Sequence, residues 1–350
     1  MNDYLIIGSG FSALIAYIHL KKYNPSIISA NIDTTKSINL IKRSNLNINK
    51  YFSSTSNSVG NFKFMISPKI SFHDRISFGG NTNIWGGFIN IEKIPLTVIK
   101  MFSDNDISLT KLELKKNGYK TNNENIRQLR NSDGQIINSK NLIRNIKNGF
   151  VDNLIFENNY ILVNYFDLQN KKITSQKFKK VLLALSFPQT IDLLFRSNII
   201  NKNIILELSE YEHKFVKTVS NRTDQYPKND HCVIKYDFLR SLKHFFGYKK
   251  NVDNLKVNIP FYVDQVFSNT TRKINLSLDL SNKVITTLDK IRFGDSIHYC
   301  NLSIDKININ NYLKNISKNL IGISSPFVNQ EAPGPISNDI ILNFLRNNNS

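Results

Sequence analysis

The stretch that decides the fold is Tyr4-Leu-Ile-Ile-Gly8-Ser-Gly10-Phe-Ser-Ala13. A short apolar strand leads into Gly8-x-Gly10-x-x-Ala13, and an apolar helical run follows from residue 14 to residue 20. This order is typical of the first strand, turn and helix of a dinucleotide-binding βαβ unit. Gly8 permits a tight turn, Gly10 has no Cβ to hold a diphosphate away, and the small Ala13 lets the helix pack close to the strand.

A second predicted strand, residues 26–32, ends at Asp33. Asp33 comes about 20 residues after the glycines, where such a unit holds a ribose hydroxyl. The turn itself also supplies Ser9, Phe11 and Ser12, which we expect to lie with the two glycines at the diphosphate. The alternative is an ordinary strand–helix turn that happens to contain glycines.

Length and composition limit the classes of protein. The chain has 350 residues, 41% of them hydrophobic, which predicts two domains or one large α/β domain with an insertion. Its two cysteines, Cys232 and Cys300, are far apart and form no CxxC motif. We therefore expect no disulfide framework, no metal site and a cytoplasmic protein. The apolar run from Tyr4 to Leu20 is too short for a membrane span and is interrupted by glycines, so no transmembrane segment is expected.

The net charge of +19 raises the question of an anionic partner. The basic residues are scattered along the chain, and no RNA-recognition, helix-turn-helix or zinc-finger signature is present. We therefore expect no nucleic-acid binding. A small anionic substrate, such as a nucleotide sugar or an acidic glycan, would benefit from the positive field.

A second glycine cluster runs from Phe78 to Gly87. Its four glycines flank a small polar core and Trp85, the only tryptophan of the chain. Glycines at this density let a backbone wrap closely around a flat or charged ligand. A glycine-rich surface loop is the simpler reading, but Phe78, Ile84 and Phe88 would be costly to expose together.

At this cluster the sequence resembles the glucose–methanol–choline (GMC) family of FAD-dependent oxidoreductases, in which a similar glycine segment lies against the flavin. Two further stretches, residues 180–199 and 319–327, are similar to the family's returning strand and helix and to its C-terminal strand. The resemblance implies an α/β fold. It would have a Rossmann-like FAD-binding domain, with a parallel sheet and a β-meander, and a smaller α+β substrate domain with an antiparallel sheet.

The resemblance implies FAD as the cofactor, with its diphosphate at the first glycine turn. The isoalloxazine would lie near the second cluster, so we expect Gly10 and Gly86 to share one crevice. The implied contacts are Gly79, Gly80, Asn81, Thr82, Asn83, Trp85, Gly86, Gly87 and Ser325.

The pattern along the chain predicts how the domains are divided. Strand-like runs between residues 151 and 185 predict a β-meander leading into a buried parallel strand, and alternating runs within 201–295 predict an antiparallel sheet. We assign 1–95, 136–200 and 296–350 to the FAD-binding domain, 96–135 to a partly helical insertion, and 201–295 to the substrate domain.

The family's catalytic base is a histidine, and by position it corresponds to His298, with Asn301 and Ser303 orienting the substrate. The second catalytic position, just before a proline, falls on Gly334, which cannot carry this chemistry. Either Asn329 or Asn338 substitutes, or the reaction is altered, or catalysis has been lost.

The resemblance thus implies an oxidoreductase that oxidises a CH–OH group, on a sugar or glycan precursor, by hydride transfer to flavin N5. The electron acceptor stays open between oxygen, a quinone and a protein. Two alternatives remain: a mutase that works with reduced flavin, and a degenerate subunit that binds FAD without catalysis.

Overall fold

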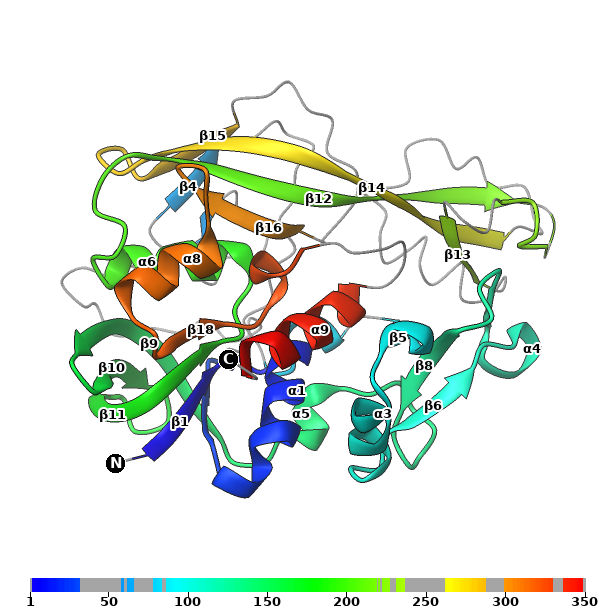
Figure 1. Cartoon of the computed structure of the whole chain (residues 1–350), viewed down its shortest axis with the longest axis horizontal. Coiled ribbons are helices and arrows are strands. Elements are labelled where there is room, and N and C mark those ends of the chain that lie inside the picture. The colour runs from blue at the N-terminus through cyan, green and yellow to red at the C-terminus, as the bar shows by residue number, and fades with distance from the viewer. Residues whose placement is uncertain are drawn as a thin grey trace.

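The structure is a computed structural model of the chain. It describes residues 2–31, 58–59, 62–65, 78–83, 86–218, 220, 222–226, 231–236, 262–287, 299–329 and 336–348. The fold is mixed α/β. One broad sheet, with β12, β14 and β16, lies above a layer that holds β1, β11 and β18, and α6 and α8 lie between them (Figure 1).

Four strands of the lower sheet run parallel in the order β2 (Ser26–Ser29), β1 (Asn2–Ile7), β11 (Lys172–Leu183), β18 (Leu320–Gly322). The alternating direction of side chains divides β1 between two cores. Leu5 and Ile7 join the core shared with the upper sheet, whereas Ile6 joins the core beneath α1 (Phe11–Leu20). Burial on both faces explains why the second half of β1, Leu5 to Ile7, is a continuous apolar run.

At the residues where the sequence predicts a meander, β9 (Ile146–Glu157), β10 (Tyr160–Asp167) and β11 pair antiparallel in succession. The expected Rossmann-like parallel sheet with a β-meander differs from the observed sheet in one respect. β9 also pairs with β2, and β11 also pairs with β1, so the five strands close into a barrel. The reason is strand length: β9 and β11 each have 12 residues, enough to pair at one end with a parallel strand and at the other with β10.

Among the described residues the upper sheet has nine strands, and it is built around the long antiparallel pair β12 (Ile204–Thr218) and β14 (Tyr262–Asp279). Both strands lie within residues 201–295, where the sequence predicts an antiparallel sheet, but other strands of the upper sheet come from residues 58–65, 119–121 and 299–308. The remaining strands are β13 (His231–Tyr236), β15 (Val284–Thr287), β16 (Tyr299–Ile304), β17 (Ile307–Asn308), β3 (Ser58–Val59), β4 (Phe62–Met65) and β7 (Tyr119–Thr121).

A third, small sheet contains β5 (Phe88–Asn90), β8 (Ile126–Arg130) and β6 (Ser108–Lys111), and α3 (Leu96–Ser103) lies close to it in Figure 1. The helices that complete the fold are α4 (Leu114–Asn117), α5 (Ser139–Leu142), α6 (Phe187–Arg196), α8 (Ile309–Ile316) and α9 (Ile336–Asn348). Short 3₁₀ turns occur at η1 (Lys21–Tyr23), η2 (Gly80–Asn83), η3 (Ile91–Lys93) and η4 (Ser325–Phe327). Of the helices that the structure describes, none has the length and apolar character to cross a membrane.

Candidate functional site

The candidate site lies where the parallel strands end. β1, β2, β11 and β18 run in the same direction, so their carboxyl ends meet at one edge of the lower sheet. β1 lies between β2, which follows it in the chain, and β11, which comes far later. The neighbouring carboxyl ends of β1 and β11 therefore come from distant parts of the chain, and the carboxyl edge of parallel strands is where α/β proteins bind their ligands.

Gly8 forms the tight turn at the end of β1. Its φ is +110°, and a Cβ at this position would lie 2.5 Å from the carbonyl oxygen of Ala184. The Gly8 N–H donates to the Ile28 carbonyl at 2.9 Å, while the Ala184 N–H donates to the Ile7 carbonyl at 2.9 Å. The absence of a side chain thus lets the turn contact both neighbouring strands.

Gly10 differs from Gly8, because in the described part of the chain no atom other than those of Gly10 and its two chain neighbours lies within 4 Å of the place where its Cβ would be. Gly10 is the N-cap residue of α1, and no side chain caps this end of the helix. The first turn of a helix presents N–H groups that have no intrahelical acceptor, together with the positive end of the helix dipole. A ligand phosphate can therefore approach the backbone here.

The second glycine segment contacts the first. The Gly79 N–H donates to the Ser9 hydroxyl at 3.0 Å, across 70 residues of sequence. A Cβ on Gly80, whose φ is +47°, would lie 3.7 Å from the Gly10 Cα. We call this meeting point, residues 8–10 with residues 78–82, the glycine junction.

The other end of the cluster is joined to β8. The Gly86 carbonyl accepts from Gln128 Nε2 at 2.8 Å, and the Gly87 carbonyl accepts from the Leu129 N–H at 2.8 Å. Both glycines therefore fix the chain to β8. That Gly10 and Gly86 share one crevice stays a prediction.

Ser139 holds the junction together, and the sequence analysis missed it. It is fully buried at the start of α5, and its hydroxyl donates to the Ser9 carbonyl at 2.5 Å. It also lies 2.9 Å from the hydroxyl of Thr82, which reaches the Gly79 carbonyl at 2.6 Å. No motif marks Ser139, because a serine in a polar stretch is recognisable only once its distant partners are known.

The Ser9 side chain is engaged within the protein. It accepts from the Gly79 N–H and lies 2.8 Å from the buried hydroxyl of Ser29 at the end of β2. Phe11 and Ala13 are buried in the core beneath α1, and Ser12 is 5% exposed. Their contribution at this turn is therefore to position the backbone.

Several predicted site residues lie outside the residues that the structure describes: Asp33, Trp85 and His298. For Asn81 and Asn83 it describes only the backbone, within η2. The strand that follows His298 is described: Tyr299 is buried in β16, and the Asn301 N–H donates to the Val328 carbonyl at 2.7 Å. β16 therefore runs beside the segment that follows β18.

Ser325 begins η4 directly after β18 and is half-buried. The neighbouring Ser324 hydroxyl donates to the Leu185 carbonyl, which joins the ends of β18 and β11. Asn338, one of two residues suggested for the second catalytic position, is engaged elsewhere. Its amide accepts from the Asn90 N–H at 2.8 Å and donates to the Asn90 carbonyl at 2.6 Å, and Asn338 is 5% exposed.

The chemistry of the junction follows from its side chains. Ser9, Ser29, Thr82 and Ser139 are neutral hydroxyls, which donate and accept hydrogen bonds but do not exchange protons near neutral pH. Within the described residues, no group of His, Cys, Asp and Glu could hold a metal ion. The junction can therefore bind and orient a ligand, while acid–base chemistry requires a residue from another segment.

No protein-family model and no curated protein sequence matches the chain. Among solved structures, the chain is similar to a flavoprotein/dehydrogenase from Cytophaga hutchinsonii. The sequence identity is 11%, the match covers 83% of this chain and 73% of that one, and the TM-score is 0.28. A TM-score this low does not establish a common fold, so the geometry of the junction alone carries the functional argument.

Proposed function

We propose that the protein is an FAD-dependent oxidoreductase acting on CH–OH groups, with a sugar or glycan precursor as substrate. One observation carries this proposal: two glycine turns from distant parts of the chain touch at the carboxyl edge of parallel strands, beside open space at Gly10. A dinucleotide requires this combination of backbone N–H groups, helix dipole and missing side chains.

The junction fits a dinucleotide in three respects. The Gly10 position leaves room for a phosphate, the start of α1 has no side-chain cap, and the hydroxyls around it are already satisfied and add no negative charge. In this proposal the backbone of residues 8–13 holds the diphosphate and Asp33 holds the ribose. The segment from Gly79 to Gly87, with Ser325, lies against the flavin.

When bound, the flavin would supply the hydride acceptor for the oxidation of an alcohol carbon. The protein's own part would be to hold the alcohol and remove its proton, a task that suits histidine because its pKa lies near neutral pH. We assign this task to His298. The position of β16 beside Val328 supports the assignment, because it brings the strand after His298 next to the end of β18.

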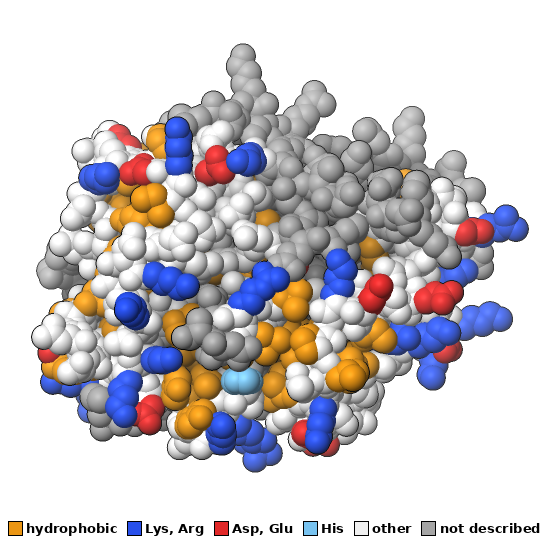
Figure 2. All heavy atoms as spheres, in the orientation of Figure 1, with side chains coloured by type: hydrophobic (Ala, Val, Ile, Leu, Met, Phe, Trp, Pro, Cys, Tyr) orange, Lys and Arg blue, Asp and Glu red, His pale blue; other side chains and the backbone are white. Residues whose placement is uncertain are grey.

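The charge distribution supports an anionic substrate better than a nucleic acid. Lys and Arg side chains are spread over the visible face and are interspersed with Asp and Glu (Figure 2). A diffuse excess of positive charge raises the local concentration of small anions without forming one binding surface for a polymer. We place the protein in the cytoplasm, where the two buried free thiols, Cys232 and Cys300, would stay reduced.

The first experiment is an absorption spectrum of the purified protein, before and after incubation with FAD. Oxidised flavin bands, with FAD identified by mass spectrometry after release, are the expected result. A colourless protein that takes up no FAD would exclude the whole class. Anaerobic bleaching by a panel of sugars, alcohols and their phosphates would then identify the substrate, and His298→Ala should abolish bleaching without loss of the bound flavin.

A degenerate FAD-binding subunit is the second candidate, and one observation favours it. The Asn338 amide is occupied by the Asn90 backbone, so it is not available to replace the residue lost at Gly334. Such a subunit would bind FAD, and no alcohol would bleach the absorption of the bound flavin. A mutase would instead need reduced flavin and would consume no electron acceptor.

A further inference from the structure

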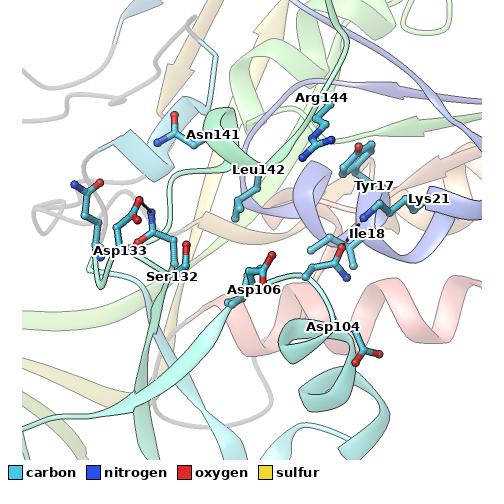
Figure 3. Close-up of a pocket in the computed structure, with 14 residues that line it drawn as sticks. Tyr17, Ile18, Lys21, Asp104, Asp106, Ser132, Asp133, Asn141, Leu142 and Arg144 are labelled. Atoms are coloured by element: carbon cyan, nitrogen blue, oxygen red, sulfur yellow. Dashed lines mark hydrogen bonds between the residues drawn. The ribbon is translucent and has the colours of Figure 1, made fainter.

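A cavity of about 380 Å³ lies beside the C-terminal half of α1, whose other end forms the glycine junction (Figure 3). Tyr17 is seven residues from Gly10, so at the rise of an α-helix the two are about 10 Å apart. The walls come from four segments: α1, the turn after α3, the turn at residues 131–135, and the stretch from α5 to Arg144. We call this cavity the α1 pocket.

The floor of the α1 pocket is apolar. Ile18 and Ile107 are buried, and Tyr17 and Leu142 are half-buried. Figure 3 places Leu142 centrally among the residues that line the pocket, with the Tyr17 ring to one side. Such a floor can pack against a ring that has a C–H face, while polar groups around it fix the orientation of the ring.

The rim of the α1 pocket is polar and carries both signs of charge. The lining contains three carboxylates, Asp104, Asp106 and Asp133, and two cations, Lys21 and Arg144. Amide side chains of the same lining add further donors and acceptors. This balance is unusual on a chain of net charge +19. The carboxylates would repel a strongly anionic ligand, and Lys21 and Arg144 would repel a strongly cationic one. The rim therefore favours a neutral ligand.

Much of this polar rim is unused within the described protein. Lys21 Nζ donates to Asn105 Oδ1 at 3.1 Å, and Asn131 Nδ2 lies 3.4 Å from Asp133 Oδ2. In the part of the chain that the structure describes, the side chains of Asp106 and Arg144 have no hydrogen bond or ion pair. A carboxylate is an acceptor only and a guanidinium a donor only, so the pocket offers both kinds of group to one ligand.

We propose that the α1 pocket binds a neutral saccharide unit. A pyranose has an apolar C–H face that can pack on the floor. A sugar hydroxyl can donate to a carboxylate and can accept from a cation or an amide. The volume admits one or two such rings. This binding site is separate from the glycine junction and does not depend on whether flavin binds there.

The test is saturation-transfer NMR on the full chain, with methyl glycosides of glucose, galactose, mannose and N-acetylglucosamine as probes. We expect transfer to at least one glycoside. Asp106→Ala and Arg144→Ala should each raise the Kd for that glycoside about tenfold or more, because each variant removes a charged hydrogen bond. Both side chains are exposed, so the variants should fold. Glu157→Ala and Lys115→Ala remove exposed charges outside the pocket and should leave the transfer unchanged.

Three results would overturn the proposal. One is no transfer to any glycoside of the panel. Another is transfer that survives both Asp106→Ala and Arg144→Ala. The third is transfer to the cation spermidine in place of the glycosides, which would make the pocket an amine site. Gly10→Ala should leave the transfer intact, so that a failure of the flavin proposal is distinguishable from a failure of this one.

Discussion

Replacing Gly10 with alanine separates folding from cofactor binding. Folding depends on the backbone angles of this residue, whereas binding depends on the space beside its Cα. The backbone angles of Gly10, φ −75° and ψ −166°, are open to any L-residue. In the described protein the new methyl group would meet no atom within 4 Å other than those of residue 10 and its two chain neighbours. It would instead point into the space that the proposal gives to a diphosphate.

The backbone angles of Gly10 and the space beside it determine how much Gly10→Ala should change the stability of the fold and the affinity for FAD. The methyl group restricts the unfolded chain, which stabilises the fold by about 0.4–1 kcal/mol. Alanine is a poorer N-cap than glycine by about 0.5–1 kcal/mol, so the two effects nearly cancel. A methyl group forced into a packed contact costs about 1–3 kcal/mol. For the bound FAD this corresponds to a Kd raised by about 5- to 150-fold.

The assay is a pair of measurements on one variant: the free energy of unfolding from urea titration, and the Kd for FAD from fluorescence quenching. Gly134→Ala is the matched control, because Gly134 also has open space around it but a φ of +70°. It should lose about 1–2 kcal/mol of stability and keep its affinity for FAD. If Gly10→Ala bound FAD as the parent does, the diphosphate would not lie at this turn.

Three further predictions concern stability. Gly8→Ala should destabilise the fold by about 3 kcal/mol, measured by urea unfolding, since its φ is +110° and its Cβ would meet the Ala184 carbonyl at 2.5 Å. Ser139→Ala should cost about 1–3 kcal/mol and also weaken FAD binding, because the Ser9 carbonyl loses its buried donor. Lys235→Met should cost about 3–5 kcal/mol at neutral pH, because Asp264, fully buried, loses an ammonium 3.1 Å away. Burial raises the pKa of Asp264, so as the pH falls through that pKa the carboxylate takes up a proton and the deficit of Lys235→Met should shrink.

Each prediction has a contrary outcome. An unchanged unfolding midpoint for Gly8→Ala would mean that β1 and β11 can separate at this turn. Loss of stability in Ser139→Ala without any change in FAD affinity would make Ser139 a structural residue only. A deficit of Lys235→Met that stays constant from neutral to acidic pH would show that Asp264 is solvated. The double variant Lys235→Met/Asp264→Leu should recover most of the lost stability.

Local patterns were enough to predict much of the lower sheet. The strand ending at Ile7, the turn at Gly8 and the helix that begins at Phe11 occur where the spacing predicts them, because each depends on neighbouring residues. The runs between residues 151 and 185 likewise predicted antiparallel strands. Closure of those strands into a barrel was not predicted, since it depends on how far β9 and β11 extend past β10.

The candidate site, like the fold, could be predicted from the sequence only in part. By itself the sequence determined that two glycine-rich turns exist and that the first of them, with Gly8 and Gly10, leads from a strand into a helix, because backbone freedom is a property of the residue type. Only the tertiary structure decided that Gly79 hydrogen-bonds to Ser9 of the first turn, and that Ser139 joins the two turns. These contacts join residues from 57 to 130 positions apart. Contacts between residues so far apart in sequence depend on the packing of the whole chain, so a local sequence pattern cannot predict them.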